Sequence, residues 1–299
     1  MNTAIFRQRL KPLMLPLAML LGLLLHNWIG YLAPLSPALI FIMLLITFSR
    51  LTVADFHIGG FIWWLLAAQV GGAVALYAVL RPLVGEIPAQ GVFVCVICPT
   101  ATAAPVVTGM LGGSVGRVAT YSLVSNLAVA LTLPPLLSWM NPVADVSFGA
   151  TLGRIAQSVL PLIIGPLIVS AAMARTVPRL RAELGRRQDW AFYVWAFSLL
   201  IVVGNAVSFV IREPRSEWSH MAALAALSLV ACLAQFWIGR RIGRRYGDAI
   251  SGSQSLGQKN TVLAIWVALS FLNPVVSVAP AAYIVWHNTV NSWQLSRRR

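Results

Sequence analysis

The chain has 299 residues, of which 59% are hydrophobic and only 10% are charged. Soluble domains carry about 25% charged residues, so this composition excludes an ordinary soluble protein and predicts a polytopic membrane protein. The net charge is +14. The basic residues lie in short segments between apolar runs and form no aromatic-interleaved stripe. We therefore interpret the charge as a positive-inside bias and expect no nucleic-acid partner.

Ten apolar segments are long enough to cross a hydrocarbon core, which needs about 20 helical residues. The sequence therefore predicts an all-α membrane protein with ten transmembrane helices, forming one polytopic domain over residues 1–299. The expected spans are approximately 13–30, 34–50, 60–80, 87–112, 115–138, 152–173, 189–211, 217–238, 248–271 and 274–293.

The distribution of basic residues predicts the orientation of these spans. With the N-terminus inside, 17 Lys and Arg side chains fall in inner segments and four in outer ones, and Lys259 lies within a span. The excess on one side predicts that both termini are cytoplasmic.

The chain divides near residue 143 into two sets of five spans. We expect repeat one over about 1–143 and repeat two over about 144–299, and an odd number of spans per set makes the repeat inverted. The matching fourth and ninth spans are both interrupted, by Pro99 and Pro105 in "CPTATAAP" and by Gly257 in "SGSQSLGQKN". Matching interruptions in two halves predict a transporter binding site at the membrane midplane. The alternative is a pair of kinks without function.

Three motifs carry a resemblance to a known family. "CPTATAAPVVTGMLGG" resembles the C-P-G-G-T-A-S-N pattern of the bile acid:sodium symporters, "LGQKNTVLA" their G-x-Q-N-x-x-L-A stretch, and "VWHNTVNSW" the V-W-H-N-x-x-G of bacterial members. The matches occur in the family's order and extend over the whole chain.

The resemblance implies a fold and a location. It implies a sodium/proton-antiporter-like fold with a panel of spans 1, 2, 6 and 7 and a core of spans 3, 4, 5, 8, 9 and 10. Discontinuous helices 4 and 9 cross in the core. It also implies elevator-type alternating access, small organic anions as substrates, and the bacterial inner membrane as location. For oligomeric state we expect a monomer or a weak homo-oligomer, with membrane lipids as the other partners.

The family's sodium-site positions differ in this chain. The Ser-Asn pair of the fourth helix falls on Ala104 and Pro105, and the bridging glutamate falls on Ser255. The glutamine before the ninth-helix asparagine falls on Lys259. Positions that could still contribute to coupling or charge replacement are Gln69, Ser122, Ser255, Gln258 and Lys259. None of the eight acidic residues lies at midplane depth, so no carboxylate is available and we expect no sodium at the family sites.

The resemblance implies that the positions contacting small acids in bacterial members of the family are retained at Thr102, Asn260, His287 and Asn288. With Thr100 and Lys259 added, the expected substrate-binding residues are Thr100, Thr102, Lys259, Asn260, His287 and Asn288. His287 could equally be a hydrogen-bonded packing residue, and the threonines could bond the carbonyl four residues earlier in a kinked helix.

Lys259 departs furthest from the family pattern. A lysine at the centre of a span costs about 2.5–3.5 kcal/mol on insertion scales, and charges inside membranes usually have a function. The ammonium could replace the missing sodium, or exchange a proton as substrate binds. It could also extend to the cytoplasmic surface and only orient the helix.

The sequence therefore predicts a secondary active transporter of a small organic anion, sodium-independent and proton-linked or uncoupled. One alternative is a sodium-coupled symporter with a degenerate site. A different class, a retinal-binding protein with Lys259 as its Schiff-base lysine, lacks a buried carboxylate counter-ion. No motif of an intramembrane enzyme and no cofactor motif is present, so we expect neither an enzyme nor a bound cofactor.

Overall fold

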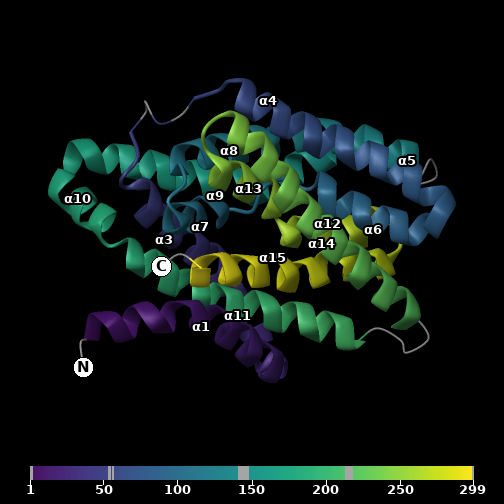
Figure 1. Cartoon of the computed structure of the whole chain (residues 1–299), viewed down its shortest axis with the longest axis horizontal. Coiled ribbons are helices and arrows are strands. Elements are labelled where there is room, and N and C mark those ends of the chain that lie inside the picture. The colour runs from purple at the N-terminus through teal and green to yellow at the C-terminus, as the bar shows by residue number, and fades with distance from the viewer. Residues whose placement is uncertain (1–2, 53–54, 56, 141–147, 213–217, 298–299) are drawn as a thin grey trace.

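The structure, a computed structural model of the whole chain, describes residues 3–52, 55, 57–140, 148–212 and 218–297. The described chain is almost entirely helical, and the long helices lie alongside one another (Figure 1). The predicted boundary between the repeats lies outside the described residues, as do Asp145, Glu213, Arg215, Glu217, Arg298 and Arg299. The helices in chain order are α1 (Thr3–Leu24), α2 (His26–Ile29), α3 (Ser36–Phe48), α4 (Gly60–Leu66), α5 (Gly72–Val84), α6 (Glu86–Ile97), α7 (Ala104–Leu111), α8 (Val115–Met140), α9 (Phe148–Thr176), α10 (Pro178–Arg186), α11 (Gln188–Arg212), α12 (Trp218–Arg245), α13 (Ala249–Gly257), α14 (Thr261–Phe271) and α15 (Val278–Arg297).

Within the described residues, four continuous helical stretches are long and apolar enough to cross a membrane. They are His26–Phe48, Gly60–Val84, Val115–Met140 and Trp218–Arg245. Shorter apolar helices accompany them, including Glu86–Ile97 and Thr261–Phe271. The expectation of a helical membrane protein is confirmed at this level.

Short irregular helices join or interrupt several of these stretches. A 3₁₀ segment, η1 (Gly30–Leu35), joins α2 to α3, and another, η5 (Pro274–Ser277), precedes α15. Between α4 and α5 the stretch passes through one wide π-helical turn, η3 (Ala67–Gly71). Such π-turns are frequent at functional positions, and this one holds the buried side chain of Gln69.

Short non-helical segments separate α6 from α7 and α13 from α14, where the sequence carries proline or glycine. Helix α6 ends at Ile97, two residues before Pro99, and α7 begins at Ala104, so that Pro105 lies in its first turn. A proline is tolerated there because the amide it removes would have no partner inside the helix. Helix α13 ends at Gly257 and α14 begins at Thr261.

The two interruptions meet in space. Thr100 and Lys259 form an isolated antiparallel β-bridge. The Ala101 amide donates to the Gln258 carbonyl at 3.0 Å, and the Asn260 amide donates to the Pro99 carbonyl at 2.8 Å. These backbone bonds satisfy polar groups that two broken helices would otherwise leave unpaired inside a membrane. We call this junction, residues 98–103 with 258–260, the helix crossing.

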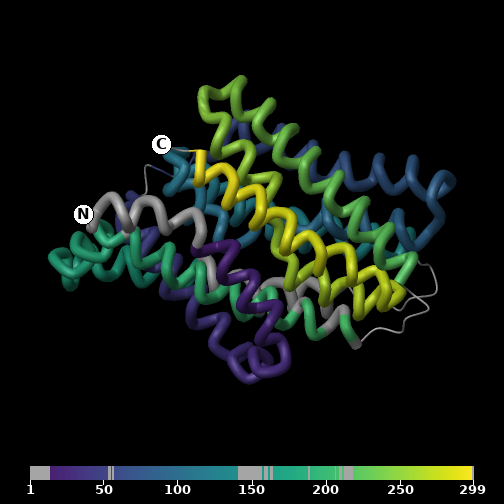
Figure 2. The backbone as a smooth tube through the Cα atoms, turned by 60° about the horizontal axis from the view of Figure 1, so that its bottom comes forward, coloured from purple at the N-terminus to yellow at the C-terminus, as the bar shows by residue number. Residues whose placement is uncertain are grey.

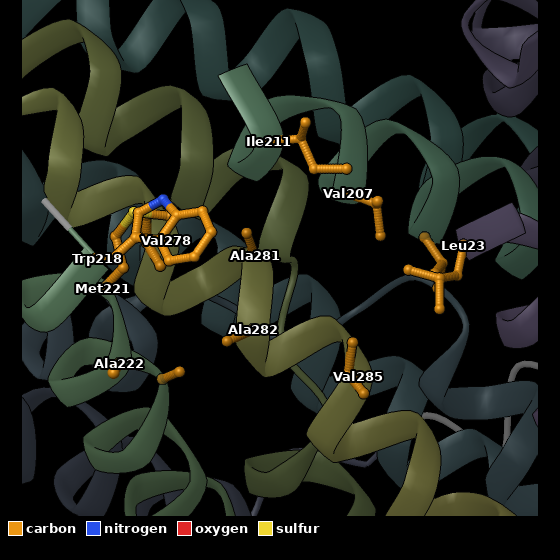
Figure 3. A pocket seen from close by; sticks show the side chains of 12 residues that line it. Leu23, Val207, Ile211, Trp218, Met221, Ala222, Val278, Ala281, Ala282 and Val285 are labelled. Atoms are coloured by element: carbon orange, nitrogen blue, oxygen red, sulfur yellow. The ribbon is translucent and has the colours of Figure 1, made fainter. Parts of the chain in front are cut away.

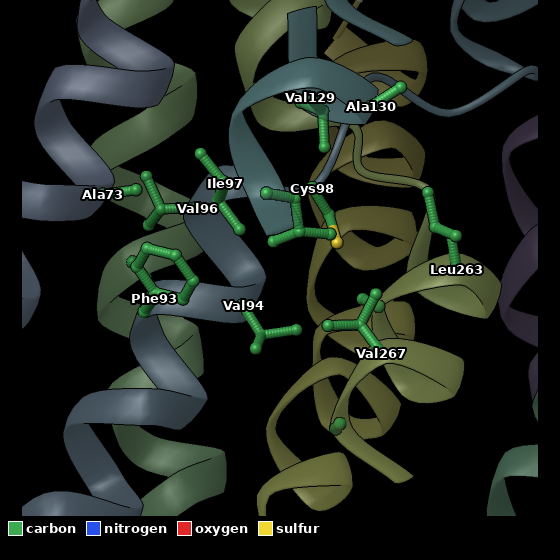
Figure 4. Packing of buried hydrophobic residues seen from close by; sticks show 14 of the residues in the cluster. Ala73, Phe93, Val94, Val96, Ile97, Cys98, Val129, Ala130, Leu263 and Val267 are labelled. Carbon is green, nitrogen blue, oxygen red and sulfur yellow. The ribbon is translucent and has the colours of Figure 1, made fainter. Parts of the chain in front are cut away.

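Apolar side chains enclose the end of α6 beside the crossing. Figure 4 shows Cys98 between Ile97 on one side and Leu263 and Val267 of α14 on the other, with Val129 and Ala130 of α8 above them. All of these residues belong to one buried cluster. Protein side chains therefore surround the crossing on several sides, so that lipid does not cover it completely.

The helices form two sets around the crossing. Helix α11 packs against α1 and α3, and α3 packs against α9, whereas α12 packs against α13, α6 and α15. Helix α15 also contacts α1 and α11, so it lies between the two sets (Figures 1 and 2). The end of α15, helix α10 and the start of α1 lie at the same end of the molecule in Figure 1.

Candidate functional site

Lys259 lies at the centre of the helix crossing. Its side chain is 1% exposed, and its ammonium donates a 2.8 Å hydrogen bond to the carbonyl of Val96. The side chain therefore runs inward to the end of α6 and does not extend to the surface, which argues against the interpretation that it only orients the helix. No ion pair joins it to an acidic side chain among the residues that the structure describes.

Side chains from three different elements cap the carbonyl end of α6. Gln235 of α12 donates to the Cys95 carbonyl at 3.4 Å, and Lys259 donates to the next carbonyl, that of Val96. Gln69 donates to the carbonyls of Ile97 and Cys98 at 2.7 and 3.1 Å. The last carbonyls of a helix have no partner within the helix and form the negative end of its dipole. A cation and two amides therefore stabilise this end in place of water.

The carbonyl end of α13 is capped in a similar way. The Thr100 hydroxyl donates to the Ser255 carbonyl at 2.6 Å, and the Tyr283 hydroxyl donates to the Gly257 carbonyl at 2.9 Å. Thr100 was expected to bind substrate, but it is fully buried and its hydroxyl hydrogen is used in this bond. In this conformation Thr100 is a capping residue.

A glutamine and a tyrosine form a pair on each side of the crossing. The Tyr121 hydroxyl of α8 donates to the Gln69 side-chain oxygen at 2.5 Å, and Ser125 donates to the same oxygen at 3.1 Å. The Gln235 amide of α12 donates to the Tyr283 hydroxyl of α15 at 2.9 Å. The sequence analysis identified only Gln69 of these four residues. The other three lie singly within predicted spans, and no motif in the sequence pairs them with one another or with Gln69.

Four buried oxygens of α8, α12 and α13 have no hydrogen-bond partner among the described residues. They are the hydroxyls of Ser122 and Ser255 and the side-chain oxygens of Asn126 and Gln235. All four residues are at most 5% exposed. These oxygens are neutral, and the acids of the described chain lie at helix ends or in loops. The donors present therefore do not provide the carboxylate that a buried sodium ion usually requires, and no cluster of metal-binding side chains occurs in the described ranges.

The remaining predicted substrate residues divide by exposure. Thr102 and Asn260 are partly exposed on the crossing, and the Asn260 side chain accepts from the Leu263 amide at 3.1 Å as the cap of α14. His287 and Asn288 of α15 are buried, and the Asn288 amide donates to the Ile284 carbonyl at 2.7 Å. Of the six predicted substrate residues, only Thr102 and Asn260 are not buried.

Gln258, the remaining predicted coupling residue, belongs to a buried glutamine chain. Its side-chain amide donates to Gln254, and Gln254 donates to Gln294 of α15 at 2.7 Å. Gln258 and Gln254 are 1% and 0% exposed. These hydrogen-bonded glutamines link the crossing to the last turns of α15.

A separate pocket of about 500 Å³ lies between α1 and α11 on one side and α12 and α15 on the other (Figure 3). Its lining is aliphatic apart from Trp218 and the thioether of Met221, and none of the predicted site residues contributes to it. The residues from α15 that line it are Val278, Ala281, Ala282 and Val285. Ala281 and Tyr283 are two residues apart and hence about 200° apart around the helix, so the pocket and the Tyr283 bond lie on opposite faces of α15.

Compared with known proteins, the chain matches no model of a protein family and no curated protein sequence.

Proposed function

We propose that the chain is a secondary active transporter of a small organic anion, in which the ammonium of Lys259 takes the place that sodium ions hold in the bile acid:sodium symporters. The observation that carries the proposal is the position of the lysine. A buried ammonium meets the carbonyl end of an interrupted helix, inside a protein of long apolar helices, with no carboxylate beside it in the described chain.

The charge arrangement around the crossing supports an anionic substrate. Helices α6 and α13 direct their negative carbonyl ends into the crossing, and these ends are capped by Lys259, Gln69, Thr100 and Tyr283. Helices α7 and α14 begin on the other side of the same junction with their positive amide ends. Transporters with discontinuous helices use such amide ends to bind a carboxylate. The partly exposed Thr102 and Asn260 lie directly before these helix starts.

The packing supports an inverted repeat of five spans with a panel and a core. In each half a glutamine from the third span of the set bonds a tyrosine from the fifth: Gln69 with Tyr121, and Gln235 with Tyr283. Helices α1, α3, α9 and α11, the expected panel, pack on one another, and α12, α14 and α15 pack around α6. Elevator-type movement of the core against the panel would open the crossing to each side of the membrane in turn.

The first experiment identifies a substrate class. Purified protein would be heated in detergent with pantoate, with taurocholate and with a panel of other monocarboxylates, in sodium chloride and in choline chloride. We expect at least one acid to raise the melting temperature equally in both salts. An acid that stabilises only in sodium would contradict the proposed replacement of sodium by Lys259.

The second experiment tests the lysine itself in proteoliposomes loaded with the stabilising acid. Lys259→Gln keeps a donor for the Val96 carbonyl but removes the charge, and Lys259→Met removes both. We expect folded Lys259→Gln to lose at least tenfold in counterflow of the acid. Normal counterflow by Lys259→Gln would show that the charge is not needed.

A second candidate function is a sodium-coupled symporter with a degenerate site. The unpartnered oxygens of Ser122, Asn126 and Ser255 favour it, because neutral oxygens without partners could be ion ligands. The choline substitution above separates the two candidates: uptake by this alternative would stop when sodium is removed.

A further inference from the structure

One face of α15 carries a row of polar side chains whose first and last members bond α13. Tyr283, His287, Asn291 and Gln294 are spaced by four, four and three residues, which places them on one side of a helix. We call this row, with Gln254 and Gly257 of α13, the polar seam. Both ends of the row bond α13: Tyr283 donates to the Gly257 carbonyl at 2.9 Å, and Gln294 accepts from Gln254 at 2.7 Å.

The middle of the polar seam is buried but unsatisfied. Asn291 is 0% exposed, and neither its amide nitrogen nor its oxygen has a partner among the described residues. The Nδ1 atom of His287, one turn earlier, is likewise buried without a partner. An unpaired polar group of this kind destabilises the folded protein if it remains dry. A primary amide can make up to four hydrogen bonds, so an Asn291 side chain without any partner would destabilise the fold more than a single unpaired donor or acceptor would.

The nearby apolar pocket cannot supply the missing partners. Its α15 residues, among them Ala281 and Val285, lie on the opposite side of the helix from the polar seam, and its lining is almost wholly apolar. A solute in that pocket would therefore not reach Asn291. A ligand of the seam has to fit between α15 and α13 and both donate and accept hydrogen bonds.

Water is the ligand with this chemistry. A buried water typically makes about three hydrogen bonds to groups that would otherwise be unsatisfied. Asn291 and His287 offer three such atoms within one helical turn, and the bonded glutamines Gln254 and Gln294 extend the polar row to the half-buried last turns of α15.

We propose that the polar seam binds ordered water at Asn291 and His287, and that this water forms a hydrated path from the helix crossing to the membrane face where α15 ends. The role of this path rests on the proposed function: it would bring water to the backbone that surrounds Lys259. Its inner end is close to the lysine: Tyr283 bonds Gly257, and its partner Gln235 bonds the Cys95 carbonyl, next to the Val96 carbonyl that Lys259 takes.

The test is hydroxyl-radical footprinting with short X-ray pulses on the whole protein in nanodiscs, read by mass spectrometry, because radicals formed from bound water oxidise side chains that bulk solvent does not reach. We expect oxidation of His287 although it is only 6% exposed. Trp195, 4% exposed in an apolar cluster, and the fully bonded Tyr121 are reactive controls that should remain unmodified. Labelling of His287 no greater than that of Trp195 would overturn the proposal.

Two variants assign the water to Asn291. Asn291→Leu replaces the amide with an apolar group of similar size and should lower His287 oxidation at least fivefold, whereas Asn291→Ser keeps a hydroxyl and should retain most of it. Unchanged labelling in a monodisperse Asn291→Leu protein would contradict the assignment. Should Asn291→Leu fail to fold, the comparison of His287 with Trp195 and Tyr121 in the wild type still decides whether the seam holds water. The readout needs no substrate, so it can succeed or fail independently of transport.

Discussion

The side chain of Gln69 forms four buried hydrogen bonds beside the helix crossing. It donates to the carbonyls of Ile97 and Cys98 and accepts from Tyr121 and Ser125. All of these groups are buried. A substitution at this position therefore leaves several polar groups unsatisfied at once.

Gln69→Leu should destabilise the protein by about 1–3 kcal/mol for each group that stays unpaired. The measurement is thermal or denaturant unfolding in detergent. Tyr121→Phe removes one bond of the same network, so the double variant should lose less than the sum of the two single variants. Strict additivity of the two losses would indicate that the 2.5 Å bond between Tyr121 and Gln69 contributes little.

Asp55 gives a pH-dependent feature outside the membrane spans. Its carboxylate accepts from the amide and the hydroxyl of Thr52, each at 2.7 Å, and these bonds lower the pKa of Asp55 below its usual value, the amide bond contributing most. Since the folded pKa is the lower one, the turn is fully stabilised above the ordinary aspartate pKa of about 3.9. The stabilisation is lost as the pH falls through the lowered value.

Slow exchange of the Thr52 amide with deuterium should therefore persist at pH 5 and disappear in strong acid, after correction for the intrinsic exchange rate. Asp55→Asn keeps an acceptor oxygen but no titrating group, so its protection should be weaker and should not change across this range. Equal pH dependence in the two proteins would rule out Asp55 as the cause.

At the scale of helices, the approach of α12 to α13 depends on glycine. A β-carbon at Gly239 would lie 2.2 Å from the carbonyl oxygen of Gly252, which is backbone and cannot turn aside. Helix α13 carries Ser255 and leads directly into Lys259, so its position determines where the crossing lies. Close glycine contacts of this kind are typical of helix pairs in membranes.

Gly239→Ala should force α12 and α13 apart and lower the free energy of unfolding by about 1–3 kcal/mol, as overpacking does. Gly72→Ala in α5 is the matched control, because nothing lies within 4 Å of a β-carbon there. That change should be neutral or stabilise the helix by up to about 1 kcal/mol. Comparable melting temperatures for the two variants would contradict the close contact.

The helical character and the two interruptions could be predicted from sequence because both are local properties. Apolar runs indicate helices, and Pro99, Pro105 and Gly257 indicate places where a helix is interrupted. The capping of α6 by Gln235, the pairing of Tyr283 and the unsatisfied Asn291 could not be predicted. They depend on which helices lie together, and a polar residue inside an apolar run does not reveal its partner. Thr100 is an example, because its bond to the Ser255 carbonyl joins residues 155 positions apart, which no local pattern in the sequence shows.

For the whole molecule, arginines stacked on aromatic rings mark one end of the helices. Arg187 lies over Trp190 at the start of α11, Arg241 over Trp237 near the end of α12, and Arg297 over Trp293 at the end of α15. The three tryptophans are more than half exposed. Tryptophan prefers the membrane interface, and arginine is enriched on the cytoplasmic side. These pairs lie on the side that the count of basic residues predicts to be cytoplasmic.

Reporter fusions test this orientation. A fluorescent protein fused after Arg299 or inserted within the loop that precedes α11 should fluoresce in a bacterial host, because that protein folds in the cytoplasm. Alkaline phosphatase inserted after Asn141 or after Glu213, between successive predicted spans, should be active because it needs the oxidising side of the membrane. The pattern follows from an even number of spans between the inner sites and an odd number between an inner and an outer one. Phosphatase activity at the C-terminus would reverse the assignment, and with it the side to which the polar seam of α15 opens.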